Sequence, residues 1–272
     1  MGKDRDAQHV KNLQRIKLLR PVDDEFMRCL FRGQLMLAQE VLRIITGIDD
    51  LVLTSEETQR DVKRLAGARS VCLDVYGKDS SGRRYNLEVQ RDDAGAGARR
   101  ARYHSSAMDV EALLAGQGFG DLPESYVIFV TERDVFGRGA GVYRFDRYES
   151  RLGIKLGDGA HVLYANASYK GPGELGDLMH DFLCSDPDEM RTLLLAERAR
   201  YYKQDPGGVV QMSKILEEMC EEARQEGIEQ GIERERLASI RGVMDSLKVE
   251  GQKAMDILGI PASDRAKYFS ML

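Results

Sequence analysis

The sequence lacks the features that define several common classes of protein. Its 272 residues include four cysteines, which are scattered along the chain and form no C-x-x-C pair. Zinc ribbons and disulfide frameworks need closely spaced or paired cysteines. We therefore expect buried, reduced thiols that pack as small apolar side chains. The four are Cys29, Cys72, Cys184 and Cys220.

Long hydrophobic segments are also missing. No stretch approaches the roughly 18 apolar residues that a membrane span requires. The N-terminal sequence MGKDRDAQHVKNLQRIK has no apolar segment of the kind found in signal peptides. We therefore expect a cytoplasmic protein with no membrane partner.

Two frequent catalytic motifs are absent. No serine or cysteine occupies a nucleophile elbow, and the stretch AGAGARR at 94–100 lacks the GK[ST] ending of a P-loop. His180 and Asp181 resemble a catalytic pair, but adjacent residues on a helix point about 100° apart. We expect a packing or capping role for these two residues.

The overall charge limits how the protein could bind nucleic acid. Hydrophobic residues make up 42% and charged residues 31% of the chain, which is typical of a globular protein with some highly charged helix. The net charge of −5 argues against a surface covered with cationic side chains. A local basic groove is still compatible with it, because electrostatic attraction depends on where the charges lie.

The segment 71–90 contains the strongest pattern in the chain. Two runs, VCLDVY at 71–76 and YNLEVQ at 85–90, alternate apolar and polar residues on either side of the turn-forming segment KDSSGR. Such alternation predicts two half-buried strands joined as a hairpin. In a suitable register Asp74, Glu88 and Gln90 would gather on one face. The alternative is a solvated sheet face with ordinary polar residues.

This group of side chains predicts a metal-assisted site that acts on a phosphate ester. Mg²⁺ prefers oxygen ligands, so Asp74 and Glu88 are the expected ligands, and Mn²⁺ is an alternative ion. Gln90 could orient the attacking water. The basic residues nearby are the expected contacts to nucleic acid, and they are Arg83, Arg84, Arg91, Arg99, Arg100 and Arg102.

Helices and strands alternate through the first two thirds of the chain. Helical periodicity predicts a first core helix over 23–47 and a second helix over 98–116, in which we expect Tyr103 to be buried and His104 exposed. Strands are predicted at 125–131, 142–149 and 161–167, the first of them buried on both faces. The order predicts an α/β fold with a mixed sheet and helices packed on it.

The C-terminal third is helical and highly charged. A long helix over 209–248 has heptad-like apolar spacing and is interrupted by Gly227 and Gly231, and two short helices flank 259–261. This pattern favours either a homodimer through the C-terminal helices or packing back on the domain. We expect a flexible segment at 1–20, an α/β domain at 21–170 and a helical region at 171–272.

Several segments together resemble the PD-(D/E)XK nuclease family transposases, which are relatives of the recombination-promoting nucleases. The likeness covers roughly residues 20–205 and is most specific over 71–131. The segments are PVDDEFM, LAGARSVCLDVYG, SGRRYNLEVQR, ARRARYHSSAMD, LPESYVIFVTERDVFG and LMHDFL.

The resemblance implies a restriction-endonuclease-like α-β-β-β-α-β core. It matches the motif aspartate to Asp74, the motif glutamate to Glu88, and the usual lysine position to Gln90. Asp24 matches the acid of the N-terminal motif, and Glu40 is a weaker candidate for a helix-borne acid. The implied activity is Mg²⁺-dependent hydrolysis of DNA in recombination or mobile-element movement. Because Gln90 is neutral, the alternative is a catalytically degenerate nuclease-fold module that binds nucleic acid or assembles with protein.

Overall fold

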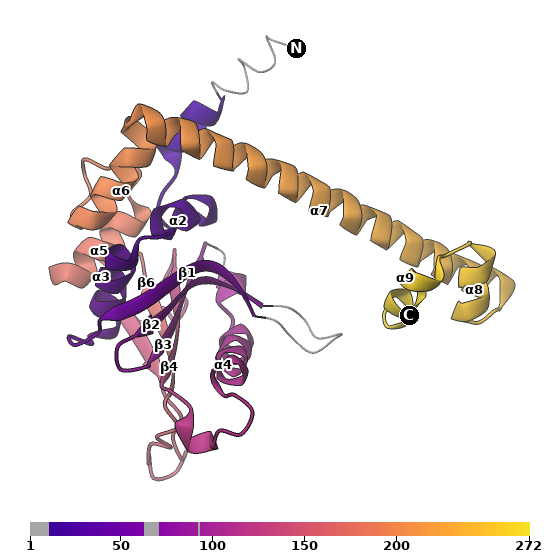
Figure 1. The fold of residues 1–272 in the computed structure, drawn as a ribbon, viewed down its shortest axis with the longest axis horizontal. Helices are drawn as coiled ribbons and strands as arrows, with labels where there is room; N and C mark the ends of the chain where they lie inside the picture. The colour runs from indigo at the N-terminus through magenta and orange to yellow at the C-terminus, as the bar shows by residue number, and fades with distance from the viewer. Residues whose placement is uncertain (1–10, 63–70, 92) are drawn as a thin grey trace. The chain divides into compact units, whose positions relative to one another are not determined.

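A computed structural model describes residues 11–62, 71–91 and 93–272 of the chain. The chain divides into two compact units, one extending to Ser213 and the other formed by Lys214–Leu272. The first unit contains a mixed sheet with helices on both faces, so the predicted α/β class is confirmed (Figure 1).

The sheet has six strands in the order β1-β2-β3-β4-β6-β5. Strands β1, β2 and β3 form an antiparallel meander, β3, β4 and β6 are parallel, and β5 pairs antiparallel with β6. Each parallel connection needs a crossover, and α4 supplies the one between β3 and β4. The strands are β1 Leu53–Val62, β2 Val71–Asp79, β3 Arg84–Gln90, β4 Ser125–Thr131, β5 Val142–Phe145 and β6 Ala160–Asn166.

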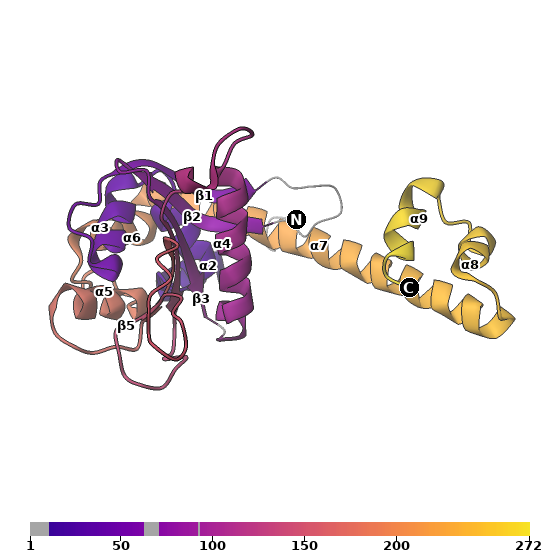
Figure 2. The ribbon, with the colours of Figure 1, turned by 90° about the horizontal axis from the view of Figure 1, so that it is seen from below.

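Helices cover the two faces unequally. Helix α4 lies on one side of the sheet, and α3, α5 and α6 lie on the other (Figures 1 and 2). All seven residues of β4 are buried, as the continuous apolar run SYVIFVT predicts for a strand covered on both faces. The helices are α2 Asp24–Phe31, α3 Leu35–Thr46, α4 Ala98–Ala112, α5 Gly173–Leu183 and α6 Leu193–Gln204.

The segment predicted as one core helix over 23–47 is two helices, so that prediction is wrong. Helix α2 ends at Phe31 and α3 begins at Leu35. Gly33 between them has a φ of 67°, a left-handed conformation that glycine adopts without the steric cost of a Cβ. The apolar periodicity continues across the break because both helices bury residues in the same core.

The described boundary between units differs from the one expected near 170. Helices α5 and α6 pack against α2 and α3 and belong to the first unit. Their apolar faces complete the core on that side of the sheet, with Phe182 and Leu195 fully buried. Strand β5 ends at Phe145, before the predicted 149.

Two expectations about burial are corrected. Cys29 and Cys184 are buried as expected, but Cys220 is exposed because it lies on a solvent-facing side of the long helix. The side chain of Cys72 lies outside what the structure describes. Tyr103, expected in the core, is 40% exposed on α4.

The second unit is a small helical assembly. It begins at Lys214, within helix α7 (Pro206–Leu247), which runs through Gly227 and Gly231 without a break, and α8 (Gly251–Ile257) and α9 (Ala262–Phe269) follow. The two short helices lie where the sequence predicted them. Their small core with the end of α7 is Ile240, Ala254, Met255, Ile260 and Tyr268.

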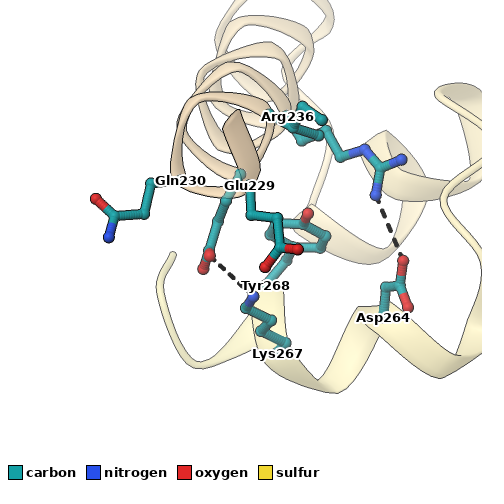
Figure 3. Close-up of a pocket in the computed structure, with 8 residues that line it drawn as sticks. Glu229, Gln230, Arg236, Asp264, Lys267 and Tyr268 are labelled. Carbon is teal, nitrogen blue, oxygen red and sulfur yellow. Dashed lines mark hydrogen bonds and ion pairs between the residues drawn. The ribbon is translucent and has the colours of Figure 1, made fainter. Parts of the chain in front are cut away.

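A pocket between α7 and α9 is lined mainly by charged side chains (Figure 3). Lys267 Nζ lies 2.8 Å from Glu233 Oε2, and Arg236 Nη1 lies 3.5 Å from Asp264 Oδ2. These ion pairs join the two helices. The charges that line the pocket therefore compensate one another and help to hold α9 against α7.

In the described part of the chain, no helix combines the length and the apolar character needed to cross a membrane.

Candidate functional site

The hairpin register brings Asp74 and Glu88 together. Val75 pairs with Leu87 in the antiparallel β2–β3 ladder, so Asp74 and Glu88 are the next neighbours across the two strands. The main-chain N–H of Asp74 donates to Oε1 of Glu88 at 3.3 Å. Both residues are buried, with exposed fractions of 7% and 0%. We call these two acids and their hydrogen-bonded neighbours the carboxylate site.

Glu88 is fully engaged by surrounding donors. Its Oε1 accepts from Asn86 Nδ2 at 3.0 Å and lies 3.3 Å from His104 Nδ1, while Oε2 accepts from Arg100 Nη2 at 2.8 Å. Burial alone would raise the pKa of Glu88. The hydrogen bond and charge of His104, the hydrogen bond from Asn86 and the charge of Arg100 outweigh burial and hold that pKa below its usual value.

Far fewer interactions stabilise the charged form of Asp74. Among the described residues, Nε2 of Gln59 on β1 donates a hydrogen bond to its Oδ1 at 3.0 Å. Burial raises the pKa of Asp74 to about 7, and the charges of Glu88 and Asp24 add to the rise, which Arg28 and Gln59 reduce in part. The two acids therefore differ: Glu88 is held ionised, and Asp74 readily holds a proton near neutral pH.

Asp24 lies at the start of α2, a helix that packs against β1, β2 and β3. Its carboxylate forms a two-point ion pair with Arg28, at 3.1 Å to Nε and 2.8 Å to Nη2. Burial raises the pKa of Asp24, Arg28 opposes the rise, and the charge of Glu88 adds to it. The acid expected in the N-terminal motif thus shares the electrostatic environment of the carboxylate site.

Gln90 is held between β3 and the start of α4. Its Oε1 lies 3.5 Å from Arg100 Nη1, and the same nitrogen lies 3.4 Å from the carbonyl of Gly95. A Cβ built on Gly95 would stand 2.0 Å from Gln90 Oε1. The missing side chain at residue 95 therefore leaves the space that the Gln90 amide fills.

The six arginines expected to bind nucleic acid are not gathered at one place. Arg83 donates to the buried Asp79 at 2.6 Å at the turn of the hairpin. Arg84 begins β3, about 13 Å along the strand from Glu88 at 3.3 Å per residue. These two cations lie at the end of the hairpin away from Gln90.

The other four arginines lie near the carboxylate site in sequence, but their contacts differ. Arg91 pairs with Asp23 at 3.2 Å and with Glu132 at 3.6 Å. Arg99 and Arg102 are exposed on α4, and Arg100 between them contacts Glu88. Helical geometry thus turns one arginine of this run toward the sheet and its neighbours toward solvent.

Three residues of the carboxylate site were missed in the sequence. Asn86 lies two residues before Glu88, so strand alternation alone places it on the same face. His104 was expected to be exposed but is 4% exposed, four residues after Arg100 on the same helix face. Gln59 belongs to β1, whose register no pattern in the sequence indicates, and it has a left-handed φ of 58°.

The donor set suits a hard divalent cation. The two carboxylates offer oxygen, His104 adds a ring nitrogen 3.3 Å from Glu88 Oε1, and Asn86 Oδ1 is a buried oxygen with no hydrogen-bond partner among the described residues. A dication would also compensate the charge that burial now penalises at Asp74. The described residues contain no group of three or more His, Cys, Asp or Glu side chains arranged to hold a metal ion.

A second polar cavity of about 700 Å³ lies beside α5 and includes His180 and Arg191. Asp181, next to His180, is fully buried and accepts from the main-chain N–H groups of Arg191 and Thr192, at 2.9 and 2.6 Å. These contacts tie Asp181 to the segment just before α6, in the packing role expected for it, and its Oδ1 also lies 2.9 Å from Nδ1 of His180.

Comparison with protein-family models, with curated proteins and with solved structures finds no match for this chain.

Proposed function

We propose that the protein is a metal-dependent nuclease that hydrolyses DNA phosphodiester bonds, in the setting of recombination or mobile-element movement. The observation that carries this proposal is the buried pair Asp74 and Glu88, brought together by adjacent strands beside a run of arginines. The succession of helix, three antiparallel strands, crossover helix and parallel strand is compatible with a restriction-endonuclease-like core.

The roles of the chain's own residues follow from their positions. Asp74 and Glu88 would hold Mg²⁺ or Mn²⁺, and Asp24 would add negative charge to the same region. The bound ion would supply charge neutralisation at the phosphate and a lowered pKa for water. Gln90, with an amide that can both donate and accept, would orient the water. Arg100 adds the positive charge that residue 90 lacks.

One observation favours a second candidate, a nuclease-fold module that binds nucleic acid without cleaving it. Both carboxylate oxygens of Glu88 already have protein donors, from Asn86 and Arg100. A metal would have to displace Arg100 or share Oε2 with it. A protein that keeps these contacts permanently would bind DNA through its surface arginines and catalyse nothing.

The test is a cleavage assay on supercoiled and linear DNA, with RNA as a second substrate, in Mg²⁺ and in Mn²⁺. We expect the wild type to nick DNA and Asp74→Ala to lose the activity. Asp49→Asn, which removes an exposed carboxylate at the turn after α3, is the matched control. Calorimetric titration with Mn²⁺ should show binding to the wild type and its loss in Glu88→Ala.

Full activity in Asp74→Ala would refute the assignment of the site. A wild type that binds DNA but neither binds Mn²⁺ nor cleaves any substrate would favour the non-catalytic module.

A further inference from the structure

The guanidinium of Arg100 makes one short contact and several long ones. Nη2 lies 2.8 Å from Glu88 Oε2, whereas Nη1 lies 3.5 Å from Gln90 Oε1 and 3.4 Å from the Gly95 carbonyl, and Nε lies 3.4 Å from His104 Nε2. The side chain is thus held at this position mainly by the charge of Glu88. Its other neighbours are the Gln90 amide, the Gly95 carbonyl and the His104 ring, all at the limit of hydrogen bonding.

Arg100 and a metal ion would compete for the same atom. Oε2 of Glu88 has Arg100 as its donor, while Oε1 is taken by main-chain and side-chain donors of the sheet and by His104. Oε2 is therefore the oxygen through which Glu88 could reach an ion. A guanidinium and a dication cannot both approach one oxygen closely without strong repulsion.

The side chain of Arg100 borders solvent and can turn away from Glu88. Its side chain is 40% exposed, while Glu88 beside it is fully buried. Arg99 and Arg102 are exposed on the same helix, so three guanidinium groups of this helix are accessible from solvent. A phosphate of a nucleic-acid strand would find there a guanidinium with a geometry suited to two parallel hydrogen bonds.

We propose that Arg100 exchanges partners during substrate binding: it pairs with Glu88 in the metal-free protein and with a DNA phosphate once a cation occupies Glu88. This inference rests on the proposed nuclease function and names the residue that contacts the substrate phosphate. The exchange makes metal binding and DNA binding cooperative. Each ligand removes Arg100 from the position that opposes the other, and the coupling is reciprocal.

The experiment compares Arg100→Gln with Arg99→Gln in the full chain at pH 8 and fixed ionic strength. Both variants lose one positive charge from the same helix turn, but the Arg99 side chain is exposed and leaves Glu88 paired. Thermal melts first establish that the variants are folded. Mn²⁺ affinity without DNA is measured by calorimetry, and duplex affinity is measured by fluorescence anisotropy in EDTA and in Ca²⁺.

We expect opposite changes from one substitution. Arg100→Gln should tighten Mn²⁺ binding by about tenfold, because a charge-assisted hydrogen bond no longer competes for Glu88. The same variant should weaken duplex binding in Ca²⁺ by about tenfold and lose most of the gain in DNA affinity that Ca²⁺ gives the wild type. Arg99→Gln should leave Mn²⁺ affinity unchanged and keep that gain.

Unchanged or weaker Mn²⁺ binding in Arg100→Gln would overturn the exchange. An equal effect in Arg99→Gln would also overturn it, because the change would then reflect net charge alone. If Arg100→Gln does not fold, Arg100→Lys carries the test, since lysine keeps the charge but not the planar fork. It should bind Mn²⁺ like the wild type and bind DNA in Ca²⁺ more weakly, and equal DNA binding would refute the role.

The failure of this inference is separable from failure of the proposed function. Opposite shifts of metal and DNA affinity in a protein that cleaves nothing would support the exchange and refute the nuclease. Metal-dependent cleavage that needs Asp74, with no change in Mn²⁺ affinity in Arg100→Gln, would leave the nuclease standing and refute the exchange. A wild type that binds no Mn²⁺ would refute both.

Discussion

The main-chain N–H of Asp74 donates to a side-chain oxygen of Glu88 across strands β2 and β3. This contact holds two buried acids side by side, but it serves them unequally. Glu88 gains a hydrogen bond to its charged form, whereas Asp74 gains a negative neighbour. The carboxylate site therefore contains one acid stabilised as the anion and one that burial drives toward the neutral form.

This asymmetry predicts a pH-dependent stability. The pKa of Asp74 is raised to about 7, above the value near 3.9 expected in the unfolded chain. Between these values the folded state binds a proton that the unfolded state does not, so metal-free stability should fall as pH rises from about 4 to 7. For the wild type we expect the free energy of unfolding to fall by an amount on the order of a few kcal/mol over this range. Asp74→Asn has no titrating group at this position, so its stability should not show this fall.

Urea unfolding in EDTA at pH 5 and pH 8 measures this effect. The stability of Asp74→Asn relative to the wild type should increase between the two pH values, and that of Asp49→Asn should not. A constant difference at both pH values would contradict the raised pKa.

A glycine beside the site provides a test of Gln90 that leaves its side chain intact. In Gly95→Ala the new methyl would meet the end of the Gln90 side chain and force it to move. Because a flexible side chain can yield, we expect a stability change of less than about 1 kcal/mol. Cleavage should fall at least tenfold if Gln90 orients water.

Parallel cleavage assays of Gly95→Ala and Gln90→Ala make the comparison. Wild-type activity in Gly95→Ala together with its loss in Gln90→Ala would show that the amide works from another position.

Lys203 joins distant segments of the first unit through its ammonium group. Nζ donates to the main-chain carbonyls of Lys17 at 3.0 Å, Leu19 at 2.5 Å and Ser185 at 2.5 Å. Lys203→Met keeps the stem but leaves three carbonyls without this donor, so we expect a loss of about 3 kcal/mol in the free energy of unfolding. Guanidinium titration is the measurement.

Lys170→Met, at an exposed position, is the control and should change stability by less than about 0.5 kcal/mol. Burial lowers the pKa of Lys203 to about 8, so the comparison belongs at pH 6.5, where the ammonium form predominates. Equal stability of the two variants would show that water replaces the lysine at these carbonyls.

The glycines of α7 make a further prediction. A Cβ at Gly227 or Gly231 would meet no atom within 4 Å other than the backbone of α7 itself, and each glycine in a helix interior costs about 1 kcal/mol relative to alanine. The double substitution Gly227→Ala/Gly231→Ala should therefore increase helix content and raise the stability of the helix by up to about 2 kcal/mol. Circular dichroism during thermal unfolding measures both.

Gly176→Ala provides the contrasting case, because its Cβ would stand 1.7 Å from the Gly171 carbonyl and should destabilise α5.

The homodimer through the C-terminal helices remains a prediction. Sedimentation of the Gly227→Ala/Gly231→Ala variant, compared with the wild type, measures whether these glycines take part in self-association. Weaker self-association after the two alanine substitutions would assign the glycine surface of α7 to a second copy of the chain.

Local patterns predicted the elements well where period and length agreed. The alternation around Asp74 and Glu88 indicated two strands, and the uniformly apolar segment at 125–131 indicated a strand covered on both faces. The pairing of the two acids needed one more fact, the length of the turn between them, which sets the register.

The predictions from sequence were wrong where backbone geometry set the end of a helix or where tertiary packing set the burial of a side chain. Gly33 ends a helix inside a continuous apolar pattern, because its positive φ interrupts the helix without changing which residues are buried. His104 is polar and lies on a charged helix, yet Glu88 provides a buried partner for it. Neither feature is visible until the strands are in register and α4 is packed on the sheet.

Most of the carboxylate site comes from one short part of the chain. Asp74 and His104 mark its limits, and Asn86, Glu88, Gln90 and Arg100 lie between them. Loops that close over so few residues lose little conformational entropy, and local contacts of this kind form quickly. The ion pair of Glu88 with Arg100 can therefore assemble before β4 and β6 join the sheet, so that the central strands are added to a hairpin in which Glu88 already has its partner.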